Sequence, residues 1–214
     1  MKKLILAVPK GRILNELNPV MKKAGIEVEK DFYNIDSRRL LFKTNFKYLD
    51  IIRVRSFDVA TFVALGAAHL GVAGDDVLKE FKYEDVNSVL DLRIGKCKLS
   101  VAHKKDNTKN NQNNGYLMVA TKYKNTVTNY YAEKGIRAEC IKLNGAIELA
   151  PKLGICSTIV DLVSSGKTLS ENNLEETEIL FKITSKLIVN KIAFKLNNDK
   201  VSLIIGKFKK AVSG

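Results

Sequence analysis

The most informative stretch of the chain is ICSTIVDLVSSGKTL, residues 155–169. An apolar run leads to Asp161, and small hydroxyl residues then surround Gly166. A turn of this kind presents backbone N–H groups and hydroxyls to an anion, and its glycine lets the backbone approach a phosphate closely. Asp161 is expected at the end of this strand, where a carboxylate could hold ribose hydroxyls, because ligands of open α/β sheets bind beyond the carboxyl ends of the strands. The stretch predicts a phosphate loop on an α/β sheet, and an ordinary Ser/Gly turn is the alternative.

A different kind of phosphate loop is excluded at the same place. Gly166-Lys167-Thr168 has the ending of a P-loop, but the pattern G-x-x-x-x-G-K-[ST] also needs a glycine at position 161. The chain has Asp161 there, so the hypothesis of a P-loop NTPase fails.

Outward from this stretch, strand-like and helix-like segments alternate, which predicts an α/β fold with largely parallel sheets. The predicted strands are residues 4–8, 49–54, 70–73, 99–102, 116–120, a segment ending at Ile141, and 178–189. The predicted helices are residues 13–24, a segment capped by Asp58, 126–134 and 192–211. Residues 104–115 are polar and of low complexity, and they predict an exposed hairpin loop. A second unit begins near Val89, and the chain returns to the first near Glu176.

Composition excludes several classes of protein. The net charge is +13, but the excess is mostly lysine and is scattered, without a basic stripe interleaved with aromatic residues. We therefore favour solvated lysine faces over nucleic-acid binding. The chain has 3 cysteines, an odd number without C-x-x-C spacing, which indicates neither a disulfide framework nor a zinc site.

The amino-terminal apolar run, residues 4–8, is shorter than the roughly 7 to 15 residues of a secretory signal. No other apolar run approaches the roughly 20 residues of a membrane-spanning helix. We therefore predict a cytoplasmic protein without a membrane span, whose first apolar run is a buried strand.

From Glu148 onward the chain resembles the ATP phosphoribosyltransferase family. The matching positions are Glu148, Gly154, Ile159, Asp161, Leu162, Ser165, Gly166, Thr168 and Leu169. The spacing is fixed over more than twenty positions, which makes the match specific. One departure is Cys156, where the family prefers Ser, Ala or Gly.

The resemblance runs through nearly the whole chain. The other similar segments are AVPKGR at 7–12, SRRL at 37–40, RSFDV at 55–59 and LGVAGDDVL at 70–78. Two positions in or next to residues 70–78 depart from the family pattern. His69 stands where aspartate is usual, and Asp75 stands where many relatives carry lysine.

The resemblance implies a fold of two α/β domains of the periplasmic-binding-protein type II kind around a cleft. Domain I is expected at residues 1–88 and 177–214. Domain II is expected at residues 89–176 and carries the phosphoribosyl pyrophosphate loop.

The resemblance also implies the first step of histidine biosynthesis, in which ATP and phosphoribosyl pyrophosphate give N1-(5-phosphoribosyl)-ATP and pyrophosphate. Mg²⁺ is expected as the cofactor, carried by the substrate and without protein ligands. Catalysis then depends on positioning and on electrostatic stabilisation.

Residue roles follow from the same resemblance. Asp161 is expected on the ribose hydroxyls. The 5′-phosphate is expected to be cradled by Ser164, Ser165, Gly166, Lys167 and Thr168. Arg55 and Arg38 are the expected catalytic residues facing the pyrophosphate, with Lys10 and Arg12 as weaker candidates for the same charge. Two questions stay open: whether Arg38 or Arg39 faces the cleft, and whether Glu148 orients the loop of domain II or is an exposed helix carboxylate.

The expected partners are the two substrates and a regulatory subunit. The chain stops at Gly214, and the short form of the family relies on a separate subunit resembling histidyl-tRNA synthetase, with which it forms a hetero-octamer. The alternative from another class is a non-catalytic small-ligand-binding protein of the same two-domain fold.

Overall fold

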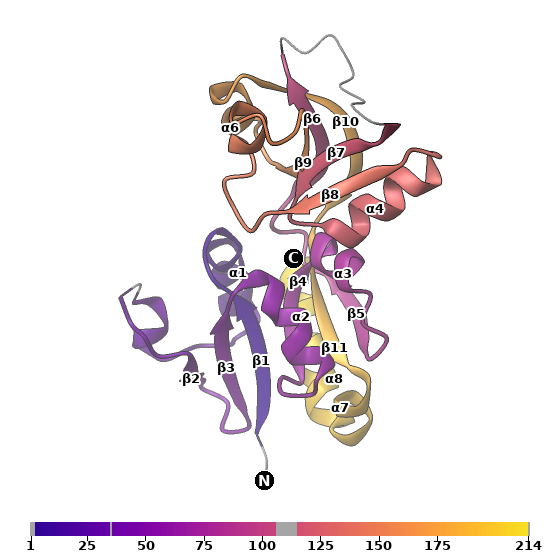
Figure 1. Ribbon diagram of the computed structural model, residues 1–214. Helices are drawn as coiled ribbons and strands as arrows, with labels where there is room; N and C mark the ends of the chain where they lie inside the picture. The colour runs from indigo at the N-terminus through magenta and orange to yellow at the C-terminus, as the bar shows by residue number, and fades with distance from the viewer. Residues whose placement is uncertain (1–2, 35, 106–114, 214) are drawn as a thin grey trace. The chain divides into compact units, whose positions relative to one another are not determined.

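The computed structural model describes residues 3–34, 36–105 and 115–213, and the chain forms two compact units (Figure 1). Unit 1 comprises residues 1–95 and 184–214, and unit 2 comprises residues 96–183. The chain crosses between them several residues beyond the boundaries expected at 88/89 and 176/177. The reason is that β5 (Val86–Asp91) still pairs with β11 (Ser185–Asn190) in the sheet of unit 1, while β10 (Leu174–Ile183) belongs throughout to the sheet of unit 2.

Unit 1 contains a six-stranded sheet in the order β2-β3-β1-β4-β11-β5. The bounds of its remaining strands are Leu4–Pro9 for β1, Leu41–Lys43 for β2, Leu49–Val54 for β3 and Leu70–Gly74 for β4. Strand β1 pairs in parallel with both β3 and β4, whereas β2 and β11 run antiparallel to their neighbours. The carboxyl ends of β1, β3 and β4 therefore meet at one edge of the sheet.

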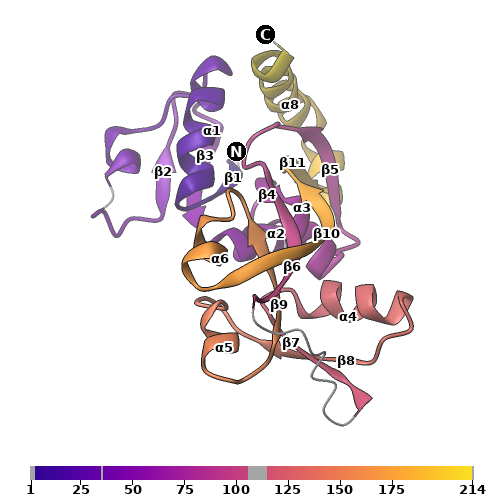
Figure 2. The same cartoon turned by 90° about the horizontal axis from the view of Figure 1, so that it is seen from above.

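Helices cover both faces of this sheet. On one face, α1 (Arg12–Lys23) packs beside α8 (Asn198–Ser213) (Figure 2). On the other face, α2 (Ser56–Ala64) packs against β1 and β4 and beside α3 (Asp75–Phe81). The 3-10 helix η1 (Lys30–Tyr33) follows α1, and the short α7 (Lys191–Leu196) precedes α8.

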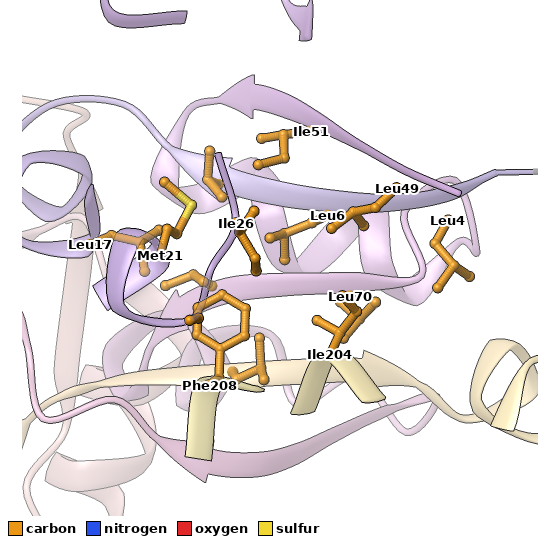
Figure 3. Packing of buried hydrophobic residues seen from close by; sticks show 14 of the residues in the cluster. Leu4, Leu6, Leu17, Met21, Ile26, Leu49, Ile51, Leu70, Ile204 and Phe208 are labelled. Carbon is orange, nitrogen blue, oxygen red and sulfur yellow. The ribbon is translucent and has the colours of Figure 1, made fainter. Parts of the chain in front are cut away.

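Both faces of the sheet are apolar because both are covered. Leu4 and Leu6 of β1 pack with Leu17 of α1 and with Ile204 and Phe208 of α8 (Figure 3). The alternate residue Ala7 belongs instead to the core under α2 and α3. This double burial explains why the strand appears in the sequence as a continuous apolar run.

Unit 2 contains a five-stranded sheet in the order β10-β6-β9-β7-β8. The bounds of its other strands are Cys97–Lys104 for β6, Leu117–Thr121 for β7, Ala138–Lys142 for β8 and Thr158–Val163 for β9. Strand β9 is parallel to β7 and antiparallel to β6. Its helices α4 (Lys124–Glu133), α5 (Leu149–Lys152) and α6 (Lys167–Glu171) pack against β8, β9 and β10 respectively.

The predicted α/β class is confirmed, and most predicted strands lie within one or two residues of the observed bounds. The prediction of largely parallel sheets is wrong, because β2 and β11 in unit 1 and β6 and β10 in unit 2 pair antiparallel to their neighbours. The strand predicted at 178–189 is in fact two strands in different sheets, because the chain crosses between units at Ile183–Thr184. The closing helix is also divided, with α7 ending at Leu196 and α8 beginning at Asn198.

Two local predictions are wrong. Asp58 does not cap α2, because the N-cap position is Arg55 and Asp58 lies in the first turn. Residues 106–114 of the predicted hairpin loop lie outside the described residues, but β6 and β7 are not sheet neighbours, since β9 lies between them. In the described part of the chain, no helix combines the length and apolarity that crossing a bilayer requires.

Gly71 of β4 provides a test of the packing under α2. A Cβ at this position would lie 2.8 Å from Val59 Cγ1 and 2.8 Å from Val63 Cγ2, and both valines are fully buried. Gly71→Ala should therefore destabilise unit 1 by about 1–3 kcal/mol. Urea unfolding followed by circular dichroism measures the change.

The matched control is Gly206→Ala in α8, where a Cβ has no such atom within 4 Å. Alanine favours a helix interior over glycine by about 0.5–1 kcal/mol, so this variant should be more stable than the wild type. Equal unfolding midpoints for the two variants would contradict the packing described for α2.

Candidate functional site

The predicted phosphate loop forms one continuous strand, turn and helix in unit 2. Asp161 lies within β9 and not at its end, opposite Ser100 of β6. The Asp161 side chain is half-buried, and its Oδ1 accepts a hydrogen bond from the Leu162 N–H at 2.8 Å. The strand continues to Val163, after which the turn begins.

Gly166 makes the turn into α6. Its φ is 77°, in the left-handed region that glycine adopts without strain. The hydroxyl of Ser165 accepts a hydrogen bond from the Lys167 N–H at 3.4 Å. Because α6 starts directly after this glycine, the amides of its first residues have no partner inside the helix.

Buried residues hold both ends of the loop. Val163 is 4% exposed and Leu169 is 6% exposed, and both belong to the core of unit 2. Between them the exposed residues are Ser164, Ser165, Lys167 and Thr168. Lys167 lies 3.8 Å from the Glu171 carboxylate, but both side chains are well exposed, so this ion pair is weak. The structure thus brings together all six residues predicted for the phosphoribosyl site.

Two titratable side chains near the start of β9 are uncharged near pH 7. Burial lowers the pKa of the His103 imidazole, and its Nδ1 lies 3.0 Å from the Thr158 hydroxyl. Burial raises the pKa of the Cys156 thiol, whose Sγ lies 3.1 Å from the Thr158 carbonyl oxygen. Both groups are therefore neutral near pH 7, and Cys156 is a small packed residue of the strand entry.

A cationic edge forms in unit 1, where β1 and β3 end together. The last register pair is Pro9 with Val54, and the Lys10 N–H donates to the Val54 carbonyl at 2.9 Å. Lys10 and Arg55 are the next residues of the two strands, so they lie at the same edge, and both side chains are exposed. Arg12 is the first residue of α1 and is also exposed.

The structure separates the roles of Arg38 and Arg39. Arg39 Nη2 lies 2.7 Å from Glu29 Oε1, and its Nη1 lies 3.5 Å from Asp31 Oδ2. Its guanidinium also lies 5.4 Å from the Phe42 ring centroid. Arg38 is exposed and makes no hydrogen bond or ion pair with the described residues. The Arg39 side chain is therefore engaged in unit 1, and the Arg38 side chain is the one available to a ligand.

Arg53 is absent from the predicted site residues, although it organises the segment before Arg38. Its side chain is 7% exposed. It donates hydrogen bonds to the carbonyl oxygens of Phe32 at 2.7 Å, Asn34 at 3.3 Å and Ser37 at 3.1 Å. A cavity of about 290 Å³ borders Arg53 together with Lys10 and Ser37, so unit 1 is concave beside the cationic edge.

The alternation of side chains along β3 could have predicted that Arg53 is buried. Leu49, Ile51 and Arg53 alternate along β3 and therefore share one face of the strand. Leu49 and Ile51 are both fully buried. The pattern thus places Arg53 on the core face, where a buried guanidinium needs several acceptors.

The departures at positions 69 and 75 have structural explanations. His69 Nδ1 accepts a hydrogen bond from the Ile5 N–H at 3.1 Å, which joins β4 to β1. Asp75 Oδ2 accepts hydrogen bonds from the Thr184 N–H at 3.0 Å and from its hydroxyl at 3.3 Å, and it lies 3.5 Å from Lys186 Nζ. An anionic side chain occupied in this way is unsuited to contact a phosphate.

Two further features concern ligands. Glu148 is half-buried at the N-cap position of α5 and makes no capping hydrogen bond. Within residues 3–34, 36–105 and 115–213, no three His, Cys, Asp or Glu side chains gather as a metal site would require.

The loop after β9 and the cationic edge belong to an α/β protein, and their exposed hydroxyls and positive charges are of the kind that suits phosphorylated ligands. The profile of the family HisG: ATP phosphoribosyltransferase matches residues 55–210. The "ATP phosphoribosyltransferase" of Paramagnetospirillum magneticum is 53% identical, covering 99% of this chain and 98% of that protein. That of Sphingopyxis alaskensis is 50% identical, covering 98% and 94%. The chain belongs to the ATP phosphoribosyltransferase family, and it is a transferase.

Solved structures agree with this assignment. A chain of the "ATP phosphoribosyl transferase (HisG:HisZ) complex from Thermotoga maritima" superposes with a TM-score of 0.84 at 30% identity, and 98% of each chain is covered. The VFT2 domain of Bordetella pertussis BvgS superposes with a TM-score of 0.60 at 10% identity, covering 99% of this chain and 87% of that one, and it shows the fold alone. The predicted periplasmic-binding-protein type of α/β fold is confirmed.

Proposed function

We propose that the chain transfers the phosphoribosyl group of phosphoribosyl pyrophosphate to N1 of the adenine of ATP, the first step of histidine biosynthesis. A bond forms between N1 and the anomeric carbon, and the bond from that carbon to the pyrophosphate oxygen breaks with its electron pair leaving on pyrophosphate. The loop from Asp161 to Leu169, anchored in the core at both ends, is the observation that carries the proposal. A second binding determinant is the cationic edge of unit 1.

The loop is suited to the phosphoribosyl end of the substrate. The first backbone N–H groups of α6 have no acceptor within the helix, and the hydroxyls of Ser164, Ser165 and Thr168 are on exposed residues. These donors, with the Lys167 ammonium, would bind the 5′-phosphate. The Asp161 carboxylate would accept hydrogen bonds from the ribose hydroxyls.

The cationic residues are suited to the leaving group. Negative charge grows on pyrophosphate as the sugar becomes oxocarbenium-like, and fixed positive charge stabilises that change. Arg55 and Arg38 would carry this role, with Lys10 and Arg12 adding to the same field. The adenine N1 is already a lone-pair nucleophile, so the reaction proceeds without a protein general base.

Divalent metal belongs to the chemistry of this family, and we propose that Mg²⁺ is bound by the substrate phosphates. It would supply neutralisation of phosphate charge. The binding task of this chain is then to recognise the metal-loaded substrate through Asp161 and the loop amides.

The proposed partner is a regulatory subunit. The Thermotoga maritima relative is a chain of a HisG:HisZ complex, and it covers 98% of this chain. We propose that this chain likewise assembles with a subunit resembling histidyl-tRNA synthetase into a hetero-octamer. We also propose a cytoplasmic location, which agrees with the finding that Cys97, Cys140 and Cys156 form no disulfide.

Asp161→Asn should weaken the binding of phosphoribosyl pyrophosphate by about tenfold or more, since hydrogen bonds to a charged acceptor are the strong ones. ATP affinity should change much less. Calorimetric titration of each substrate measures the two effects. Glu171→Gln is the matched control, an exposed carboxylate two residues beyond the loop that should bind both substrates normally. Equal losses for both substrates would remove Asp161 from the ribose.

Arg55→Ala should lower turnover by about 10² or more, the scale of losing one stabiliser of transition-state charge. The fold should persist because the side chain is exposed. Arg39→Ala is the matched control, since its guanidinium is held by Glu29, and its turnover should stay within about twofold. Wild-type turnover in a folded Arg55→Ala, or an equal loss in both variants, would exclude the proposed role.

The regulatory proposal predicts that the chain alone is insensitive to histidine at concentrations that inhibit the complex. Initial rates against histidine concentration, with and without the co-expressed partner, measure the difference. Strong inhibition of the chain alone would show that it binds the effector itself.

A further inference from the structure

Both points where the chain passes between the units are held on unit 1 by a carboxylate. Gly95 is the last residue of unit 1 before the first crossing, and its N–H donates to Glu16 Oε2 at 2.7 Å. Thr184 is the first residue after the second crossing, and its N–H donates to Asp75 Oδ2 at 3.0 Å. Each bond joins a crossing to the first turns of a helix that follows one of the parallel strands β1 and β4, α1 for Glu16 and α3 for Asp75.

The contact between α1 and Gly95 is close. A Cβ on Gly95 would lie 2.5 Å from Ile13 Cδ1 and 2.7 Å from Ser185 Oγ, and the φ of Gly95 is 65°. The Ser185 N–H donates to the Ile94 carbonyl oxygen at 2.9 Å, so the two crossing segments are also joined to each other. The first turns of α1 thus pack directly on the segments through which the chain leaves and re-enters unit 1.

The second carboxylate oxygen of Glu16 faces Arg12. Arg12 Nη1 lies 3.7 Å from Glu16 Oε1, one helical turn away. Arg12 starts α1 directly after Lys10 and Gly11, at the cationic edge. One carboxylate is therefore shared between a cation of the proposed site and a backbone amide at the crossing.

We propose that Glu16 is a positioning residue of the transferase, which orients Arg12 toward the pyrophosphate group; this rests on the proposed function. An exposed pair of this spacing contributes little by itself, because both long side chains lose entropy to form it. The hydrogen bond from the Gly95 N–H reduces the entropy cost of this ion pair. It is a charge-assisted bond that fixes the Glu16 rotamer before Arg12 binds to it. Arg12 then meets a carboxylate that is already ordered.

Asp75 provides the matched control. It holds the second crossing through Thr184 and forms an ion pair with Lys186 at 3.5 Å, and Asp91 accepts from the same threonine hydroxyl at 3.1 Å. None of these contacts includes a residue proposed to bind substrate. Loss of Asp75 therefore loosens a crossing without disturbing Arg12.

The experiment compares Glu16→Ala, Arg12→Ala, the double variant and Asp75→Ala. Glu16→Ala and Arg12→Ala should each lower kcat by about tenfold, and the double variant should lose no more than Arg12→Ala, because Glu16 acts through Arg12. Asp75→Ala should melt at a lower temperature with kcat within about twofold of the wild type. Multiplying losses in the double variant, or an equal kcat loss in Asp75→Ala, would overturn the role of Glu16.

Two further measurements remove ambiguity. Glu16→Gln keeps an acceptor for the Gly95 amide but lacks the charge facing Arg12, so segment 92–97 should keep its hydrogen-exchange protection while kcat falls. Unchanged kcat in this variant would contradict the inference. Two separate assays distinguish the two proposals. In the turnover assay, an inactive wild type would refute the proposed function. In calorimetric titration with magnesium pyrophosphate, equal affinities of wild type and Glu16→Ala would refute the role of Glu16.

Discussion

Parallel pairing of β1 with β3 and β4 is the constraint on which the positions of the charged residues depend. The register from Leu4 with Leu49 to Pro9 with Val54 makes Lys10 and Arg55 leave the sheet at the same edge. Burial on both faces fixes that register, because a slip of one residue would exchange the side chains that meet α1 and α8 for those that meet α2. The apolar core of unit 1 thereby determines where its cations lie.

The arginines of this edge divide into two kinds. Arg53 and Arg39 are engaged within unit 1, by backbone carbonyls and by carboxylates respectively, and Arg53 holds the segment before Arg38. Arg55 and Arg38 are exposed, and no hydrogen bond or ion pair from the described residues satisfies their guanidiniums. Lys10 and Arg55 bring like charges to one edge of the sheet, and an anionic ligand relieves the repulsion between them. Unit 2 likewise separates residues that hold the structure from residues available to a ligand. The buried Val163 and Leu169 anchor the loop, and the hydrogen-bond donors between them are exposed.

Local sequence patterns were sufficient to predict β1, β3 and the turn at Gly166. Each depends only on residues adjacent in the chain: an apolar run for the strands, and a glycine that can adopt positive φ for the turn. They failed where the outcome depends on distant partners. Residues 178–189 are uniformly strand-like, and only pairing with β6 on one side and β4 on the other divides them at Thr184. The acceptors of Arg53 lie 16 to 21 positions away, and the donor to Glu16 lies 79 positions away. The site roles assigned by family resemblance stay predictions, whereas the side chains that orient them became visible only in the fold.

The central claim is that these residues together perform phosphoribosyl transfer to ATP. The most direct measurement mixes the purified chain with ATP, phosphoribosyl pyrophosphate and Mg²⁺, and follows both pyrophosphate release and the mass of the adenine nucleotide. The account predicts one pyrophosphate for each N1-(5-phosphoribosyl)-ATP formed, and release that requires ATP. Binding of both substrates without any product, by the chain alone and with its partner, would contradict it and would identify a non-catalytic ligand-binding protein of the same fold.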